Sequence, residues 1–202
     1  MRRTALKLQP VIAMAQRRWE ALSELKAFHP SQWTLTDGLV ARFPLDGDAR
    51  NTVSKAAAAE TREGQPAWST GRRAGAASFD GRRFLDAGNT GDFGYYDKFS
   101  LVAWIRPERV DRGTIISRMT DTEQADGYYL SLSDGHVQLN LIKRWLDDSI
   151  RVESTRKLTP GKWVHIAVSY DGSRLADGIR LYLDGKPVPL KVNFDFINQS
   201  FK

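Results

Sequence analysis

Short runs rich in Val, Ile, Tyr, Phe and Trp, separated by turns that contain Gly and Asp, fill the chain from residue 37 onward. Such runs are typical of β-strands, and Asp-Gly dipeptides favour the tight turns of antiparallel hairpins. We predict strands at 39–44, 76–79, 84–87, 99–106, 114–119, 128–133, 136–142, 150–154, 163–170, 179–183 and 188–192. The predicted hairpin turns are Asp80-Gly81, Asp134-Gly135, Asp171-Gly172 and Asp184-Gly185. Since no long helix separates the runs, the pattern predicts a mainly β protein, an antiparallel β-sandwich of the jelly-roll type.

The predicted strand 136–142 separates apolar from polar side chains. The apolar set is Val137, Leu139 and Leu141, and the polar set is His136, Gln138 and Asn140. Because successive residues of a strand point to opposite faces, the first set is predicted to face the core and the second to form a polar sheet face. That face is a candidate concave binding surface, with Gln138 and Asn140 as candidate ligand-binding residues. A plain solvated face is the alternative.

A core between two packed sheets is the next expectation, since the inner faces of a sandwich must cover one another. The residues predicted to be largely buried are Phe43, Phe79, Leu101, Trp104, Ile115, Leu130, Leu139, Trp163, Ile166, Val168, Leu181 and Leu183.

Apolar residues recur at helical spacing ahead of the β-rich region. They are Leu8, Val11, Ile12, Ala15, Trp19, Leu22 and Leu25. Steps of three and four residues predict one amphipathic N-terminal helix over 8–28, which His29-Pro30 ends. We therefore divide the chain into a helical segment and linker, 1–36, and a β-domain, 37–202.

Charge and composition exclude several classes of function. The chain has 202 residues, no cysteine and a formal net charge of +6. Without cysteine it has no disulfide and no thiolate metal site. Its arginine pairs are isolated rather than gathered into a basic stripe, so no nucleic-acid partner is expected. No apolar run is long enough for a membrane span. Lys7, Gln9 and Pro10 interrupt the stretch after Met1-Arg2-Arg3, so we expect no signal peptide in this chain.

Several phrases, in this order, resemble a laminin G-like (LamG-like), concanavalin A-like jelly roll. They are GLVARFPLDG at 38–47, SFDG at 78–81, FSLVAWIRP at 99–107, GKWVHIAVSYDG at 161–172 and IRLYLDG at 179–185. The resemblance implies that 37–202 is such a domain. Jelly rolls similar to it continue past residue 192 with a further strand and a closing strand, so we expect this domain to be truncated at its C-terminal end.

A narrower resemblance is carried by 15–35, with RRWE and QWTL, and by KRWLDDSIRV at 143–152. These segments are similar to parts of large planctomycete multidomain proteins of uncharacterised function, which carry a cytochrome c-like haem domain upstream. The resemblance implies an extracytoplasmic piece of a longer exported protein, with neighbouring domains as partners. No C-x-x-C-H motif is present, so this chain itself binds no haem.

A cluster of oxygen-bearing side chains in the turn 46–51 is the candidate metal site. Asp46, Asp48 and Asn51 offer the carboxylate and amide oxygens that calcium prefers. The LamG-like resemblance also implies calcium near the rim of the domain, and calcium is the one cofactor considered. Arg50 within the cluster counts against it. The alternative is a turn in which Asp and Asn bond their own backbone.

Catalysis is not expected. Concanavalin A-like hydrolases place two glutamates around an aspartate on one strand, and glycoside hydrolysis needs two carboxylates about 5–10 Å apart. No strand here carries an E-x-D-x-E pattern, and Glu153 stands alone in its run. The sequence therefore favours a protein that is not an enzyme.

Aromatic residues in polar loops are the remaining candidates for ligand binding. Trp145 lies among charged residues between two predicted strands, and Tyr95 and Tyr96 lie in the loop 91–98. Exposed aromatic rings beside polar groups suit stacking on sugars or peptides. Trp145 folded back as a lid on the core is the alternative. We predict a non-catalytic recognition module for a glycan or protein within a longer exported chain, or else a structural spacer with no ligand of its own.

Overall fold

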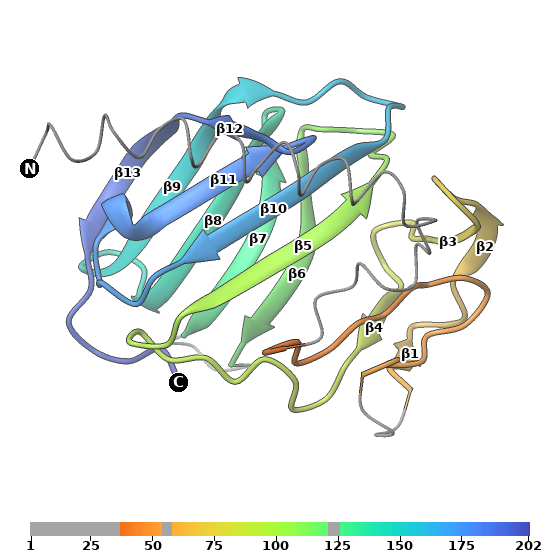
Figure 1. The fold of residues 1–202 in the computed structure, drawn as a ribbon, viewed down its shortest axis with the longest axis horizontal. Helices are drawn as coiled ribbons and strands as arrows, with labels where there is room; N and C mark the ends of the chain where they lie inside the picture. Colours follow the sequence, from red (N-terminus) through yellow and green to blue (C-terminus); the bar gives the residue numbers. More distant parts are fainter. Residues whose placement is uncertain (1–36, 54–57, 121–125) are drawn as a thin grey trace, which may run out of the picture. The chain divides into compact units, whose positions relative to one another are not determined.

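The computed structural model describes residues 37–53, 58–120 and 126–202. Two antiparallel sheets lie face to face (Figure 1). The four-stranded sheet contains, in spatial order, β12 (Lys186–Val188), β11 (Ile179–Leu183), β10 (Val164–Tyr170) and β5 (Phe99–Ile105). The five-stranded sheet contains β13 (Leu190–Phe196), β9 (Asp148–Lys157), β8 (His136–Arg144), β7 (Gly127–Ser133) and β6 (Arg112–Met119). The mainly β, antiparallel sandwich predicted from the sequence is confirmed.

Two short ribbons accompany the sandwich (Figure 1). They are β1 (Glu60–Arg62) with β4 (Phe84–Asp86), and β2 (Ala67–Thr70) with β3 (Gly75–Ser78). The predicted strand 39–44 is wrong, because the structure assigns no strand there. The predicted strand 188–192 is divided between β12 and β13 at Pro189, which lacks the N–H that a continuous ladder would use. The predicted helix 8–28 lies outside the described residues.

The tight turns follow the Asp-Gly dipeptides only in part. Asp134-Gly135 and Asp184-Gly185 have positive φ at both residues, 48° and 87° in the first turn and 53° and 74° in the second. That is the geometry of the favoured two-residue hairpins, here joining β7 to β8 and β11 to β12. Asp171-Gly172 instead begins a longer connection that includes the 3-10 helix η2 (Ala176–Gly178).

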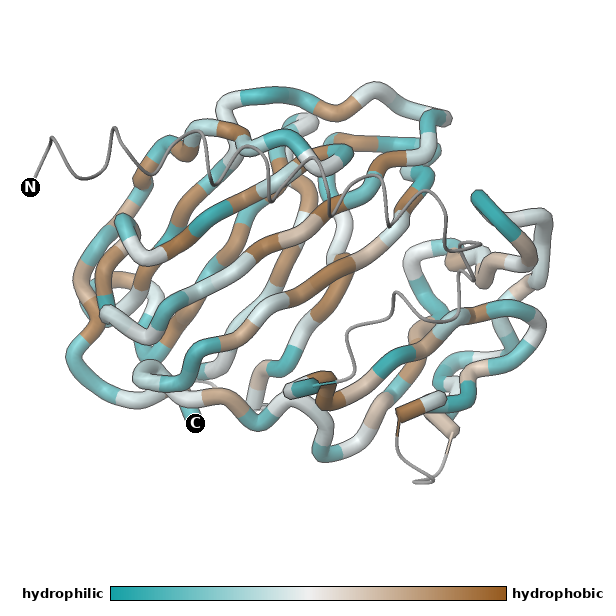
Figure 2. Tube along the Cα trace, in the orientation of Figure 1, coloured by the Kyte–Doolittle hydropathy of each residue, from teal (hydrophilic) through white to brown (hydrophobic). Residues whose placement is uncertain are grey.

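Alternating hydropathy builds the core between the two sheets, as the alternation of brown and paler residues along the long strands shows (Figure 2). Confirmed core predictions are Leu101, Leu130, Leu139, Ile166, Val168, Leu181 and Leu183. Ile115 is partly buried against this core. Phe43 and Trp163 are half-buried. The prediction is wrong for Phe79 and Trp104, which are 45% and 49% exposed.

Strand parity explains the position of Trp104. Leu101 is buried in the core and Ile105 packs against it, so the intervening Val102 and Trp104 point to the other side of β5. There Trp104 lies opposite His165, with ring centroids 5.1 Å apart, and the Arg72 guanidinium is 5.6 Å from the indole centroid. The indole therefore packs on the surface of the sheet rather than between the sheets.

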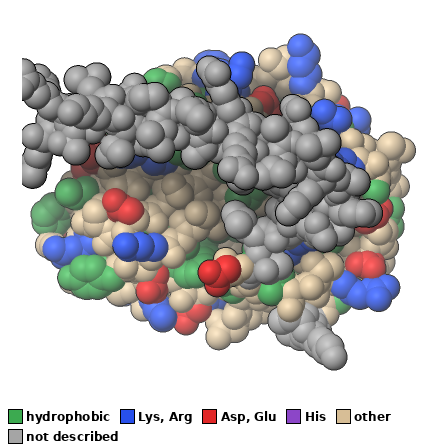
Figure 3. All heavy atoms as spheres, in the orientation of Figure 1, with side chains coloured by type: hydrophobic (Ala, Val, Ile, Leu, Met, Phe, Trp, Pro, Cys, Tyr) green, Lys and Arg blue, Asp and Glu red, His purple; other side chains and the backbone are tan. Residues whose placement is uncertain are grey.

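The surface and the helices of the described ranges add two observations. Where side chains are coloured in Figure 3, acidic and basic groups are interspersed on the visible face, a mixture typical of solvated protein surface. No helix within the described ranges has the length and apolar character needed to cross a bilayer.

Candidate ligand-binding face

The face of the five-stranded sheet turned away from the core, called the outer face below, carries ordered rows of side chains. The strand registers define three rows across β6, β7, β8, β9 and β13. The rows are Thr114–Ser131–Gln138–Glu153–Lys191, Ser117–Tyr129–Asn140–Arg151–Phe194 and Met119–Gly127–Ile142–Ser149–Phe196. Period-two alternation produces these rows in β7, β8 and β9, and bulges in β6 and β13 shift the alternation by one residue. The polar set predicted for 136–142 therefore continues into the first row, whereas the other two rows also contain aromatic and aliphatic side chains.

Trp145 lies over this face. It follows β8 in the tight connection to β9, and its ring centroid is 4.3 Å from Cζ of Arg151. The ring of Phe194 on β13 is 5.1 Å from the same atom. The indole remains 48% exposed. Of the two predicted roles for Trp145, the exposed aromatic platform fits the structure, and the lid on the core does not.

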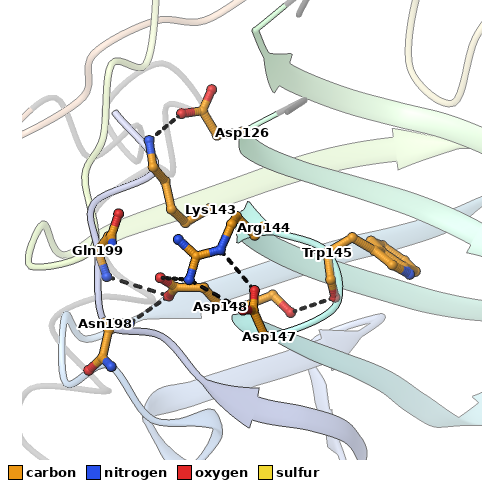
Figure 4. A network of polar contacts seen from close by, with 9 residues as sticks. Asp126, Lys143, Arg144, Trp145, Asp147, Asp148, Asn198 and Gln199 are labelled. Atoms are coloured by element: carbon orange, nitrogen blue, oxygen red, sulfur yellow. Dashed lines mark hydrogen bonds and ion pairs between the residues drawn. The ribbon is translucent and has the colours of Figure 1, made fainter. Parts of the chain in front are cut away.

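The connection that carries Trp145 is fixed by charged contacts (Figure 4). Arg144 Nε is 2.9 Å from Asp147 Oδ1, and Arg144 Nη2 is 3.5 Å from Asp148 Oδ2. Lys143 Nζ donates to Asp126 at 2.7 Å, and this bond is the main cause that lowers the pKa of Asp126. Figure 4 shows the indole of Trp145 directed away from these groups.

Two buried donors on the outer face have no hydrogen-bond partner within the described residues. They are Asn140 Nδ2 and Arg151 Nε. Asn140 is only 2% exposed, and it is the register partner of Arg151 on the neighbouring strand. Because buried polar groups are nearly always paired, two adjacent donors without a partner make this part of the outer face the candidate site.

Glu153 occupies the neighbouring row and is fully engaged. Its carboxylate accepts hydrogen bonds from Gln138 Nε2 at 2.9 Å and Lys191 Nζ at 2.8 Å. The bond from Lys191 is the main cause that lowers the pKa of Glu153 from 4.5 to about 2. Glu153 therefore stays ionised over the physiological range and fixes the amide of Gln138.

A pH dependence of stability follows from Glu153. Since its pKa is lower in the folded protein, its contribution is complete above pH 4.5 and is lost as pH falls toward about 2. Lys191 is largely exposed, which limits this contribution to about 1–2 kcal/mol. Glu153→Gln should lower the free energy of unfolding by that amount near neutral pH, and the difference from wild type should shrink toward about pH 2.5. Urea unfolding at both pH values measures it, and a difference independent of pH would contradict the assignment.

The predicted aromatic pair lies in a separate group. The rings of Tyr95 and Tyr96 are 4.3 Å apart, and the Arg174 guanidinium is 5.7 Å and 5.3 Å from their centroids. Tyr95 is half-buried and its carbonyl accepts the Tyr170 hydroxyl at 2.7 Å, whereas Tyr96 is 63% exposed. Arg174 and Phe196 also line a cleft of about 260 Å³. The structure thus brings Trp145, Gln138 and Asn140 to one face and groups the tyrosines around Arg174.

The three side chains predicted to bind calcium make other contacts in this structure. Asp46 Oδ1 accepts the backbone N–H of Gly75 at 2.6 Å, and Asp48 forms an ion pair of 2.9 Å with Arg50. Asn51 Oδ1 accepts the N–H groups of Arg42 and Val53. No group of three His, Cys, Asp or Glu side chains within the described ranges could hold a metal ion. Local bonds of the kind expected for the alternative, a turn stabilised by its own Asp and Asn side chains, are those that Asp48 accepts from the N–H of Arg50 and Asn51 accepts from the N–H of Val53.

The sequence interpretation missed Arg151 and Phe194. A signal for Arg151 exists, because Ser149, Arg151 and Glu153 alternate with apolar residues in the same way as the polar set of the preceding strand. The partnership of Arg151 with Trp145 and Phe194 depends on the register and could not be found this way.

Comparison with known families agrees with the fold. A family model described as the concanavalin A-like lectin/glucanases superfamily matches residues 83–199, which is more than half of the chain and includes every strand of both large sheets. The chain belongs to this superfamily. No curated protein matches the sequence.

Proposed function

We propose that this member of the concanavalin A-like lectin/glucanase superfamily is a non-catalytic recognition module that binds a glycan on the outer face. One observation carries the proposal: the half-exposed indole of Trp145 lies beside two buried donors, Asn140 Nδ2 and Arg151 Nε, that have no partner within the described part of the chain. A sugar offers an apolar C–H face for the indole and hydroxyl or acid oxygens for the donors.

The carboxylates of the sheet support binding rather than hydrolysis. Among the five strands, Glu153 is the only carboxylate on the outer face, because Asp148 and Asp195 alternate to the opposite side. A glycosidase needs a pair of carboxyl groups, one of which keeps a proton at working pH. With its pKa near 2, Glu153 cannot supply that proton.

The wider context belongs to the same proposal. The module is part of a longer exported protein, in which neighbouring domains supply further activities. The second candidate is a structural spacer that docks such domains, and it is favoured by the exposure of Val102 and Trp104, 56% and 49%, on the other sheet.

Trp145→Ala is expected to weaken glycan binding by about tenfold or more, because a central tryptophan platform often contributes over 1.4 kcal/mol to an interface. The experiment screens the protein on a glycan array and measures the strongest hits by calorimetry. Trp68→Ala is the matched control, since Trp68 on β2 is similarly exposed, 40%, and lies outside the outer face. The spacer interpretation is supported if no glycan binds, or if Trp145→Ala and Trp68→Ala bind the glycan with equal affinity.

A further inference from the structure

We infer that the glycan is anionic and that Arg151 binds its carboxylate or sulfate group. This inference rests on the proposed function, and it names the chemical class that the outer face selects.

Charge balance around Trp145 singles out Arg151. Lys191 is paired with Glu153 at 2.8 Å, and Lys143 is paired with Asp126 at 2.7 Å. Arg144 lies between Asp147 and Asp148 (Figure 4). In the described part of the chain, the guanidinium of Arg151 has no ion pair, and its buried Nε has no hydrogen-bond partner. A partly desolvated guanidinium without a counter-ion is costly to the protein alone, and an anionic ligand relieves that cost.

The contacts that Arg151 does make leave its donors free. The rings of Trp145 and Phe194 lie 4.3 Å and 5.1 Å from Cζ and interact with the guanidinium as cation–π partners. Such contacts hold the group in place but accept none of its N–H bonds. A planar guanidinium held in this way is suited to a two-oxygen contact with carboxylate or sulfate.

Asn140, whose Nδ2 is the neighbouring donor, also needs an acceptor oxygen. Asn140 Nδ2 is buried, unpartnered and adjacent to Arg151 in the register, so both groups need acceptor oxygens from the ligand. Trp145 adds a half-exposed apolar surface within contact of the same guanidinium. One sugar residue that bears an acid group can supply acceptor oxygens to Arg151 and to Asn140 and an apolar ring face to Trp145. An acidic peptide side chain supplies only the oxygens.

The test measures binding of the full chain to five probes by biolayer interferometry. The probes are polygalacturonate, heparin, dextran sulfate, neutral xyloglucan and poly-glutamate. The variants are Arg151→Gln, Arg151→Lys and Trp145→Ala. Arg82→Gln is the charge-matched control, because Arg82 is exposed and distant in sequence from the outer-face strands. Melting curves establish that each variant is folded. Arg151→Lys keeps the charge and loses the planar donor array, so it stays informative if Arg151→Gln does not fold.

We expect an anionic glycan to bind, with Arg151→Gln weakening it at least tenfold, Arg151→Lys by an intermediate factor, and Arg82→Gln by less than twofold. Binding of polygalacturonate alone identifies carboxylate as the recognised group, and binding of dextran sulfate alone identifies sulfate.

Equal losses of affinity for Arg151→Gln and Arg82→Gln would show unspecific attraction to the basic chain and overturn the inference. Stronger, Arg151-dependent binding of poly-glutamate would overturn it in favour of an acidic peptide. Binding of xyloglucan that depends on Trp145 but not on Arg151 would overturn it while leaving the proposed function intact, and binding of no glycan would overturn both.

Discussion

Leu139→Ala is expected to lower the free energy of unfolding by about 2–5 kcal/mol. Leu139 is completely buried on β8, and its register partners, Leu130 on β7 and Val152 on β9, are equally buried. Truncation removes apolar contact area and leaves a cavity between two sheets whose strands cannot close over it. Urea denaturation measures the loss, and an unchanged m-value shows that the same folded state is being compared.

Trp104→Ala is the control for this experiment. It removes a larger side chain, but that side chain is half-exposed on the surface of β5. We expect a loss of about 1 kcal/mol, well below that of Leu139→Ala, because surface substitutions create no cavity. If the tryptophan variant loses as much stability as the leucine variant, the assigned parity of β5 is incorrect.

The same two residues show how far the sequence predicts this fold. Around Leu139 the apolar and polar residues alternate strictly, so the buried face follows from the pattern alone. In the run 99–105 both faces contain apolar residues, with Leu101 and Ile105 on one and Val102 and Trp104 on the other. Alternation then cannot identify the inner face, and size misleads, because the largest residue lies outside. The face of β5 that turns toward the core is instead determined by the pairing of β5 with β10, a contact between segments distant in the chain.

The candidate site likewise contains some residues that the sequence pattern predicts and others that it does not. Gln138 and Asn140 belong to a single strand, and Trp145 lies in an evidently polar loop, so local pattern identifies all three. The clustering of Trp145, Arg151 and Phe194 requires the register of β9 with β13, which includes a bulge between Val192 and Phe194. A shift of one residue would turn Phe194 to the opposite face. Single-sequence pattern therefore indicates the face but not the residues that meet on it.

Asp148→Ala is expected to lower the free energy of unfolding by about 3 kcal/mol. Asp148 is 1% exposed, and its Oδ1 accepts the N–H groups of Asn198 and Gln199 at 2.6 Å and 3.4 Å (Figure 4). These bonds attach the segment after β13, which places Ile197 and Phe201 in the core. Alanine leaves both N–H groups without an acceptor and loosens two apolar anchors at once, so the cost exceeds that of a single hydrogen bond. Thermal and urea melts measure it.

Asp147→Ala separates this anchoring role from the ion pair. Both carboxylates contact Arg144, but the side chain of Asp147 is 66% exposed, and among the residues that the structure describes its one side-chain partner is the arginine. An exposed pair of this kind contributes about 0–1 kcal/mol, so Asp147→Ala should change stability little. Amide hydrogen exchange adds a local measurement, because only Asp148→Ala should accelerate exchange at Asn198 and Gln199. Equal effects of the two variants would mean that Arg144, rather than the chain end, is what Asp148 stabilises.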